Sequence, residues 1–421
     1  MREDLLERIL SSENLRAAWK QVKANKGAPG VDGVTIEEFP AKVRAEWERF
    51  RRQLLKGTYR PLPVLRVEIP KSGGGKRPLG IPTVLDRLIQ QAILQELTPL
   101  FDPHFSESSY GFRPGRSAHG AVRQVRNYAM GGYRTAVDLD LEKFFDRVNH
   151  DVLMVRVARR VKDKRVLKLI GHYLRCGVQV EGKIQPTTEG TPQGGPISPL
   201  LANILLDDLD KELAKRGHRF ARYADDVLIL VRNSTTGRRV MQSITRFVEK
   251  KLKLRVNREK SGVRYLSHTK YLGFCIRGRQ IWWSESSVET FKNQIRYLTN
   301  RSWGVSMTER VRRLSRYITG WLNYYGLSEY KKPIDELDGW IRRRVRMCYW
   351  KQWKRRGTRI GKLLSMGVEY HLAIGQGKCR RGFWYASNMN GLRYALSNAW
   401  LEANGLVYCN RNSFTMTGRM P

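Results

Sequence analysis

The sequence predicts an α+β fold, with antiparallel strands and helices along most of the chain and a helical region toward the end. Residues 220–231 read FARYADDVLILV, two apolar, β-prone arms around a tight corner, which predicts a β-hairpin. From Tyr59 to Ile69 polar and apolar residues alternate, the period of a strand. Residues 285–360 are rich in arginine and tryptophan and have helical spacing. We therefore expect a sheet-containing body followed by basic helices.

The charge balance indicates the class of partner. The 421 residues are enough for two or three domains with their own cores, and the 41% of hydrophobic residues indicate a globular chain. Lys and Arg number 78 against 39 Asp and Glu, a formal charge of +39. Because such a surplus repels itself, an extended polyanion is the expected partner, and a membrane surface is the weaker alternative. An uninterrupted apolar run of about 18 residues is absent, and the amino terminus is charged, so we expect no membrane association and a cytoplasmic location.

The cysteines are scattered along the chain and odd in number. None forms a CxxC pair, which argues against a zinc ribbon and against a disulfide framework. We expect reduced, mostly packed thiols. The five are Cys176, Cys275, Cys348, Cys379 and Cys409.

The first 70 residues predict helices followed by a hairpin. Residues 1–56 have helical spacing, and they form either a helical cap on the next domain or a nucleic-acid contact. The strand after Tyr59 leads to glycines 73–75, which predict a hairpin turn. Lys71 and Arg77 stand near the two arms, where their charge could neutralise a triphosphate. The alternative is a surface hairpin that is basic because the whole protein is basic.

The next loop, residues 109–117, reads SYGFRPGRS and alternates rings, arginines and glycines. Rings that stack on bases beside guanidiniums that hold phosphates are typical of a template groove. Tyr110, Arg113 and Arg116 are therefore candidate template or RNA contacts. A well-packed loop would have a similar sequence.

Two acidic clusters predict a metal site. In the strand through Ala136 and Leu139, alternation puts Asp138 and Asp140 on the same face, and the backbone at Leu141 offers a carbonyl. Asp225 and Asp226 lie at the hairpin tip; a solvated turn is the alternative there. Carboxylates from two strands can hold two divalent metals about 3.5 to 4 Å apart, an arrangement typical of nucleotidyl transfer.

Four other positions have alternative interpretations. Asp146 is expected to cap the helix that follows it. In residues 190–200, GTPQGGPISPL, the Gln193 amide can bond a sugar or base, and Ser198 with proline after it predicts a helix start. Lys260 is either a phosphate contact or a solvated lysine.

The order of these segments resembles bacterial group II intron reverse transcriptases, also called maturases. The matching polymerase blocks are PKSGGGKRPLGIP, SYGFRPGRSAHGAV, DLEKFFD, TPQGGPISPLLANILL, YADD, an LxxNxxK segment and YLGF. ENLRAAWKQVKANKGAPGVDG is similar to the family's amino-terminal extension. The likeness spans roughly residues 10–350 and weakens after that.

The resemblance implies a right-hand polymerase fold, with fingers, a palm of antiparallel strands backed by helices, and an α-helical thumb. It also implies two Mg²⁺ ions, for which Mn²⁺ can substitute, and assigns site residues. The implied set is Asp140, Asp225 and Asp226 as catalytic and metal-binding residues with Leu141 as a further ligand; Lys71, Arg77, Phe145, Gln193 and Lys260 at the nucleotide; and Leu272, Gly273 and Phe274 as the primer grip. The Phe145 ring would clash with a 2′-hydroxyl and favour deoxynucleotides.

The implied domains are an amino-terminal extension (1–56), fingers and palm (57–284), a thumb or domain X (285–360) and a basic, DNA-binding-like segment (361–421). The Cys-rich HNH endonuclease of some members has no counterpart, so the compact form is expected not to nick a second DNA strand.

The implied function is RNA-directed DNA polymerisation together with intron RNA binding that assists splicing and retrohoming. The implied partners are group II intron RNA, an RNA template with a DNA or RNA primer, dNTPs and target DNA; a homodimer is left open. One alternative is a splicing cofactor with little polymerase activity. Another is a domesticated reverse transcriptase in DNA repair or phage defence.

Overall fold

The computed structural model describes residues 4–70, 75–191, 194–329 and 332–410, and the chain forms two compact units, Met1–Thr269 and Lys270–Pro421. The division falls before a hairpin of β9 (Phe274–Arg277) and β10 (Gln280–Trp283), which the sequence analysis grouped with the preceding domain. The hairpin packs instead on the helices that follow it, and the ring centroids of Trp283 and Trp321 are 4.7 Å apart.

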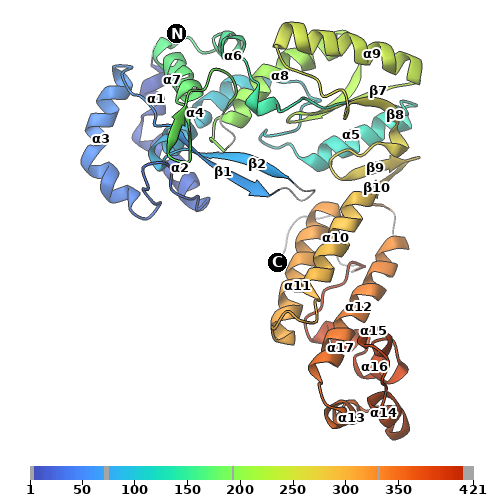
Figure 1. Ribbon diagram of the computed structural model, residues 1–421. Helices are drawn as coiled ribbons and strands as arrows, with labels where there is room; N and C mark the ends of the chain where they lie inside the picture. The colour runs from blue at the N-terminus through green and yellow to red at the C-terminus, as the bar shows by residue number, and fades with distance from the viewer. Residues whose placement is uncertain (1–3, 71–74, 192–193, 330–331, 411–421) are drawn as a thin grey trace. The chain divides into compact units, whose positions relative to one another are not determined.

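The first unit mixes helices and strands, as Figure 1 shows. Its helices are α1 (Leu5–Ile9), α2 (Ser12–Ala24), α3 (Phe39–Leu55), α4 (Val84–Phe101), α5 (Ala118–Met130), α6 (His150–Val157), α7 (Lys164–Arg175), α8 (Ser198–Lys215) and α9 (Ser234–Phe247). Its strands are β1 (Val64–Pro70), β2 (Lys76–Ile81), β3 (Thr135–Leu139), β4 (Val178–Val180), β5 (Lys183–Gln185), β6 (Arg219–Tyr223), β7 (Asp226–Val231) and β8 (Gly262–Tyr265).

The sheet that carries the acidic motifs has the strand order β6-β7-β3-β8 and is antiparallel throughout. Leu139 pairs with Val227, and Val137 with Ile229, so these side chains share one face and belong to the main core. Helix α9 packs against this sheet: a Cβ at Gly237 would lie 2.6 Å from the Val263 side chain. The acidic residues of β3 and β7 alternate onto the opposite face. The antiparallel sheet expected for a palm is thus confirmed.

A second sheet has the order β2-β1-β4-β5. β1 and β2 form the expected antiparallel hairpin, with Leu65 opposite Ile81 and Pro70 opposite Lys76. The pairing of β1 with β4 is parallel, an addition to the antiparallel expectation, because residues between the two strands return through α4 to α7.

The amino-terminal helices cover the first unit as a helical cap. α1 and α2 pack on α4, and buried residues from Leu5 onward join the same continuous core as the strands. The Ser11 hydroxyl caps α2 by accepting from the Asn14 N–H. The described part of residues 1–56 therefore packs on the body of the first unit, and its function as a cap or as a nucleic-acid contact stays a prediction.

The second unit is helical beyond its hairpin. Its helices are α10 (Glu285–Leu298), α11 (Met307–Tyr325), α12 (Lys332–Gln352), α13 (Arg356–Ser365), α14 (Tyr370–Gly377), α15 (Phe383–Ala386), α16 (Asn390–Ala395) and α17 (Asn398–Ala403). Aromatic rings fill the centre around α10 and α11: Phe291 lies 4.4 Å from Trp321, centroid to centroid. The described helices include none long and apolar enough to cross a bilayer.

Two helix starts differ from the prediction. Asp146 does not cap α6; Asn149 does, because its side chain accepts from the Val152 N–H. Ser198 is the first residue of α8 rather than its cap, and Ile197 occupies the cap position without a side-chain bond. The five cysteines are free, as expected, and two are buried.

Candidate active site

The YADD motif forms the turn of the β6–β7 hairpin. Tyr223 pairs with Asp226, so Ala224 and Asp225 are the two turn residues, and Ala224 has a left-handed φ of +56°. Asp225 is half-buried and Asp226 is exposed. The backbone of Gly111 packs on this turn so closely that a Cβ there would lie 2.3 Å from the Ala224 nitrogen. The turn is thus held in an unusual conformation against a neighbouring loop.

Asp140 follows directly after β3. Continuing the register from the Leu139–Val227 pair brings Asp140 opposite Asp226, on the same face of the sheet. The backbone of Asp140 is fixed on both sides: its N–H donates to Ser261 Oγ (2.9 Å), and its carbonyl accepts from the Asn257 N–H (2.9 Å). The next residue, Leu141, forms a bridge to Val256.

These acidic residues line one cleft of about 1140 Å³ in the first unit. The same cleft is bordered by the β1–β2 hairpin, by the segment after β3 and by the LxxNxxK segment. Its lining residues include Arg66, Glu68, Lys76, Asp140, Leu141, Phe145, Asp146, Asp225, Asp226, Asn257, Arg258 and Lys260. The motifs that are far apart in the sequence therefore meet at one site.

Burial and mutual repulsion make the acidic group costly without a cation. Burial raises the pKa of Asp140, the charge of Asp225 raises it further, and the Lys260 charge opposes both. Carboxylates and a backbone carbonyl are the ligand types that Mg²⁺ prefers, so the donor set fits a divalent cation. Within the described residues, however, no group of three or more His, Cys, Asp and Glu is gathered closely enough to hold a metal. Metal ligation by Asp140, Leu141, Asp225 and Asp226 stays a prediction.

Asp138 occupies a different environment from Asp140. It lies within β3 opposite Leu228, half-buried, and Arg264 approaches it at 3.5 Å. Burial raises its pKa, which Arg264 opposes. Asp138 is not among the residues that line the cleft. The structure thus gives it a cationic partner within the sheet.

Phe145 borders the cleft and is buried. Its backbone carbonyl accepts from the N–H of Thr191 (2.7 Å), so the first residue of the TPQGG motif holds it. Gly190 has φ +93°, and a Cβ there would lie 3.0 Å from the Phe145 carbonyl oxygen. This glycine is needed for the close approach of the two segments.

Some of the predicted nucleotide contacts cannot be located. Lys71 and Gln193 lie outside the described residues, and so does the side chain of Arg77, whose backbone is in β2. The described cations that the β1–β2 hairpin brings to the cleft are Arg66 and Lys76. Lys76 is exposed and lies 2.8 Å from Glu68.

The loop at 109–117 is more tightly packed than its sequence suggests. The Arg113 guanidinium is buried; it donates to Asp102 (2.7 Å) and to the carbonyls of Ser106 (2.7 Å) and Ser109 (3.0 Å). Arg113 therefore holds the loop instead of facing a phosphate, contrary to the template-contact interpretation. The exposed ring is Phe112, whose centroid lies 6.3 Å from that of Tyr223.

The other two predicted template contacts are also engaged within the loop. Tyr110 is buried, and the Arg116 guanidinium lies 5.8 Å from the Tyr110 ring centroid. Arg116 is half-buried and pairs with Glu107. A surface contact remains open to Arg116, whereas the Tyr110 ring is shielded.

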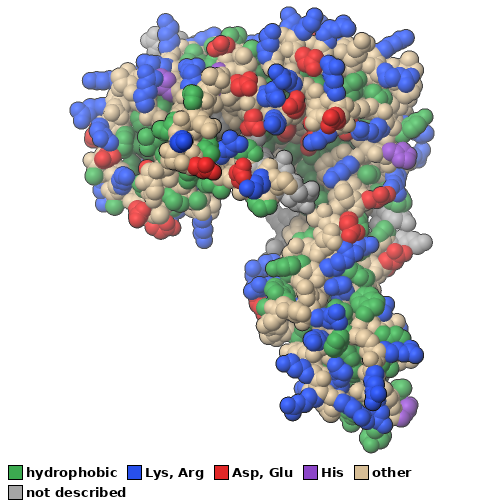
Figure 2. Space-filling view, in the orientation of Figure 1, with side chains coloured by type: hydrophobic (Ala, Val, Ile, Leu, Met, Phe, Trp, Pro, Cys, Tyr) green, Lys and Arg blue, Asp and Glu red, His purple; other side chains and the backbone are tan. Residues whose placement is uncertain are grey.

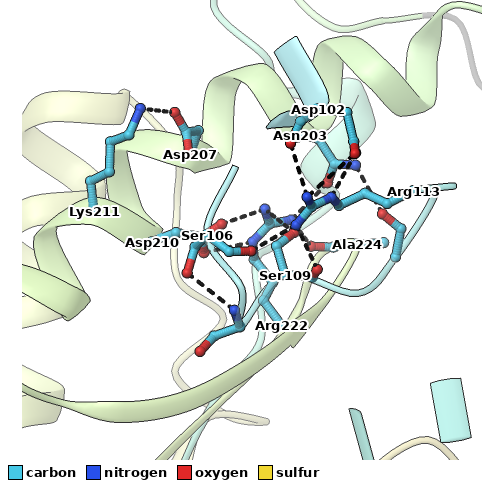
Figure 3. Close-up of polar contacts among 12 residues, drawn as sticks. Asp102, Ser106, Ser109, Arg113, Asn203, Asp207, Asp210, Lys211, Arg222 and Ala224 are labelled. Atoms are coloured by element: carbon cyan, nitrogen blue, oxygen red, sulfur yellow. Dashed lines mark hydrogen bonds and ion pairs between the residues drawn. The ribbon is translucent and has the colours of Figure 1, made fainter. Parts of the chain in front are cut away.

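Sequence reasoning missed a buried network beneath the YADD turn. Arg222, on β6, is fully buried and forms an ion pair with the equally buried Asp210 of α8 (2.6 Å). The same guanidinium donates to Ser109, to Asn203 and to the Ala224 carbonyl, as Figure 3 shows. One residue in the sequence indicates this network: Asp210 lies on the apolar face of α8, where a buried carboxylate requires a cationic partner.

The YLGF motif belongs to the second unit and forms another tight turn. Leu272 and Gly273 both have left-handed φ, +49° and +84°. Tyr324 Oη donates to the Leu272 carbonyl (2.9 Å), and Ser287 Oγ donates to the Gly273 carbonyl (2.9 Å). The Phe274 ring packs on Tyr324, centroid to centroid 5.6 Å. Helices α10 and α11 therefore shape the predicted primer grip.

The second unit presents basic and aromatic side chains together. Lys and Arg side chains are spread over its visible face in Figure 2. Near its end Tyr370, Tyr394 and Tyr385 are exposed, and the Arg381 guanidinium lies 4.5 Å from the Tyr385 ring centroid. Rings beside guanidiniums are suited to single-stranded nucleic acid.

Comparisons with known proteins agree with this architecture. The family model described as reverse transcriptase (RNA-dependent DNA polymerase) matches residues 69–276, and the group II intron, maturase-specific domain matches 288–364. Protein YkfC of Escherichia coli (strain K12) is 34% identical over 317 residues, which are 66% of this chain and 82% of YkfC. Group II intron-encoded protein LtrA of Lactococcus lactis subsp. cremoris is 29% identical over 65% of this chain.

The chain spans 56% of the length of LtrA. Among solved structures, the partial Cas6-RT-Cas1–Cas2 complex matches with a TM-score of 0.38 and 24% identity, covering 58% of this chain and 42% of that chain.

The antiparallel sheet with carboxylates at a hairpin tip and at a strand end lies within the residues that match the reverse transcriptase model, so the chain is a reverse transcriptase, an RNA-directed DNA polymerase. The chain belongs to the group II intron-encoded reverse transcriptases, or maturases. This family uses divalent metal ions and acts on nucleic acid, including intron RNA.

Proposed function

We propose that this chain copies an RNA template into DNA by two-metal nucleotidyl transfer at the cleft containing Asp140, Asp225 and Asp226. The observation that carries the proposal is that these carboxylates, from two different strands, line one cleft together with cationic side chains. We propose Mg²⁺ as the ion, with Mn²⁺ as a substitute, because the donors are oxygen atoms.

In this proposal, a primer 3′-hydroxyl loses its proton to solvent, its oxygen bonds to the α-phosphorus of a dNTP, and the bond from that phosphorus to the leaving pyrophosphate breaks. Bound metal ions supply charge stabilisation for the attacking and leaving oxygens. The carboxylates of Asp140, Asp225 and Asp226 would hold those ions. Lys260 and Arg66 reduce the negative charge at the phosphates, since both side chains line the cleft.

Substrate selection follows from the walls of the cleft. We propose that the ring of Phe145, which is buried at the border of the cleft, excludes a ribose 2′-hydroxyl and so selects dNTPs. Lys71, Arg77 and Gln193 remain our candidates for the triphosphate and the base. For the primer, whether DNA or RNA, we propose the turn of Leu272 and Gly273, whose two carbonyls are already fixed by hydroxyl groups.

We propose a second role in binding group II intron RNA, which assists splicing and retrohoming. The support is the maturase-specific match at 288–364 and the basic, aromatic surface of the second unit. Target DNA is assigned to the segment 361–421, where exposed rings lie beside arginines. A splicing cofactor with little polymerase activity is the competing function. It is disfavoured because such a cofactor would not need three carboxylates at one cleft.

The test is extension of an oligo(dT) primer on a poly(rA) template with Mg²⁺, comparing the wild type with Asp225→Asn. The proposal expects cDNA from the wild type, none from the variant, and none after chelation by EDTA. RNA binding of both proteins is measured in parallel across a salt series, because phosphate contacts weaken steeply with salt. Binding of structured RNA by both proteins without any extension would favour the splicing cofactor.

A further inference from the structure

We infer that Arg222 is a positioning residue of the polymerase site: its guanidinium fixes the YADD turn and ties that turn to the loop at residues 108–111. This inference rests on the proposed function of Asp225 and Asp226. It adds a residue that touches neither nucleotide nor metal but determines where these carboxylates lie.

The Arg222 guanidinium has five N–H donors, and all five are used. Nε and Nη2 donate to the two carboxylate oxygens of Asp210 at 2.8 and 2.6 Å. Nη1 donates to Asn203 Oδ1 and to the Ala224 carbonyl, both at 2.9 Å, and Nη2 also donates to Ser109 Oγ at 2.8 Å. Figure 3 shows these partners converging on one side chain. The guanidinium therefore has a single well-defined orientation.

The hydrogen bond from Arg222 to the Ala224 carbonyl connects this network to the active-site turn. A peptide group is planar, so fixing the carbonyl of Ala224 also fixes the N–H and Cα of Asp225. Ala224 has a φ of +56°, a left-handed conformation that is strained for an alanine. A hydrogen bond from a buried, charged donor offsets that strain. Without it, we expect the turn to relax and displace the carboxylates.

The same guanidinium also holds the neighbouring loop. The Arg222 backbone pairs with this loop: its N–H donates to the Ser108 carbonyl, and its carbonyl accepts from the Tyr110 N–H, both at 2.8 Å. Asn203, bonded to the guanidinium, donates in turn to the Gly111 carbonyl (2.8 Å). The exposed Phe112 follows directly. Arg222 therefore holds both the YADD turn, which carries Asp225 and Asp226, and the loop that contains Phe112.

The buried ion pair of Arg222 and Asp210 is not explained by its contribution to folding stability. The Arg222 and Asp210 side chains are both completely buried, and the desolvation of such a pair cancels much of its attraction. A packed apolar pair is often as stable or more stable. What an apolar pair cannot do is orient the Ala224 carbonyl, Asn203 and Ser109 at once. The network is therefore better explained by geometry at the site than by its contribution to folding.

The test is Arg222→Lys, which keeps the charge opposite Asp210 but has too few donors for all the acceptors. Its control is Arg156→Lys, because Arg156 is also buried and pairs with an aspartate of α8, Asp208 (2.9 Å), away from the turn. For each protein the unfolding temperature, the single-turnover incorporation rate at saturating dNTP, the dNTP dissociation constant and the half-saturating Mg²⁺ concentration are measured.

We expect Arg222→Lys to lower the incorporation rate about 10- to 100-fold and to raise the Mg²⁺ requirement, with little change in the dNTP dissociation constant. Arg156→Lys should lower the unfolding temperature without changing the rate. If Arg222→Lys does not fold, Ser109→Ala removes one acceptor and leaves the ion pair, and a severalfold rate loss is expected. Equal effects of the two lysine variants, or unchanged rates in both Arg222→Lys and Ser109→Ala, would overturn the inference. If the wild type is active and Asp225→Asn is inactive, the proposed function holds whether or not the inference on Arg222 does. An inactive wild type would overturn both the proposed function and this inference.

Discussion

The Tyr324 hydroxyl of α11 donates to the carbonyl of Leu272 at 2.9 Å and so connects a helix of the second unit to the turn predicted to grip the primer. Leu272 has a left-handed φ of +49°, which is unusual for a branched side chain. The turn therefore depends on neighbours that hold it. Within the second unit these neighbours belong to helices α10 and α11.

Removing the Tyr324 hydroxyl should weaken primer binding more than catalysis. We expect Tyr324→Phe to raise the KM for primer–template about 3- to 10-fold, since one hydrogen bond contributes about 1 kcal/mol. The control is Tyr317→Phe, which removes a hydroxyl from the same helix, where Tyr317 stacks on Phe291. Steady-state extension at varied primer–template concentration measures the difference. Equal KM values in the two variants would contradict a primer role for this turn.

Gly273 and Gly278 form a matched pair for backbone strain. Both have positive φ, +84° and +62°, but a Cβ at Gly273 would lie 2.7 Å from Tyr325 Oη, whereas none of the described atoms lies within 4 Å of a Cβ at Gly278. Gly278→Ala should cost about 1 kcal/mol from φ alone. Gly273→Ala should cost roughly 1–3 kcal/mol more, from overpacking. Urea unfolding measures both; equal losses would mean that the contact with Tyr325 relaxes freely.

The raised pKa of the buried Asp86 should make the stability of the protein depend on pH. Burial raises its pKa from 3.8 to about 6, although Thr83 and Tyr59 donate hydrogen bonds to it. The folded protein therefore binds this proton more tightly than the unfolded chain. Its contribution is fully present below the unfolded pKa and is lost as the pH rises through about 6.

The variant Asp86→Asn cannot titrate. The free energy of unfolding of the wild type, relative to this variant, should therefore fall between about pH 4 and pH 6 and then level off. Chemical denaturation across this range measures the difference, with Glu13→Gln on the exposed side of α2 as the control. A difference that does not vary with pH would show that folding does not raise the pKa of Asp86.

If the Phe145 ring excludes a ribose 2′-hydroxyl, removing this ring should weaken selection against ribonucleotides. Replacing the ring with Ala opens space at the wall of the cleft, and we expect discrimination between dNTP and rNTP to fall about tenfold or more. The measurement is the ratio of incorporation efficiencies for a matched dNTP and rNTP on one template. An unchanged ratio would assign the selection to another residue.

Much of this architecture could be predicted because the signals are local. The period of two in β1 and β3, the YADD corner and the apolar stripe of α4 each depend on neighbouring residues. Helix caps were less secure, because Asp146 and Asn149 are both acceptable cap residues and tertiary packing selects Asn149. Which one is used depends on how the preceding turn leaves the sheet.

The burial of Arg113, in the loop at 109–117, and of Arg222 could not be predicted from the sequence for a different reason. In a chain with 78 Lys and Arg, an arginine in a loop or strand looks like surface charge. Arg113 and Arg222 are instead buried against partners on other elements: Arg113 pairs with Asp102, which directly follows α4, and Arg222 on β6 pairs with Asp210 on α8. Only the three-dimensional contacts separate these arginines from the solvated majority.

Asp138 and Asp140 give the most direct test of the central claim, because they lie two residues apart on the same face and only Asp140 lines the cleft. The measurement is single-turnover primer extension on an RNA template with Mg²⁺, comparing Asp140→Asn with Asp138→Asn. The account predicts a loss of at least about 10³-fold for Asp140→Asn, on the scale of losing a principal charge-stabilising group, and near wild-type extension for Asp138→Asn. Robust extension by Asp140→Asn, or equal losses in the two variants, would contradict it.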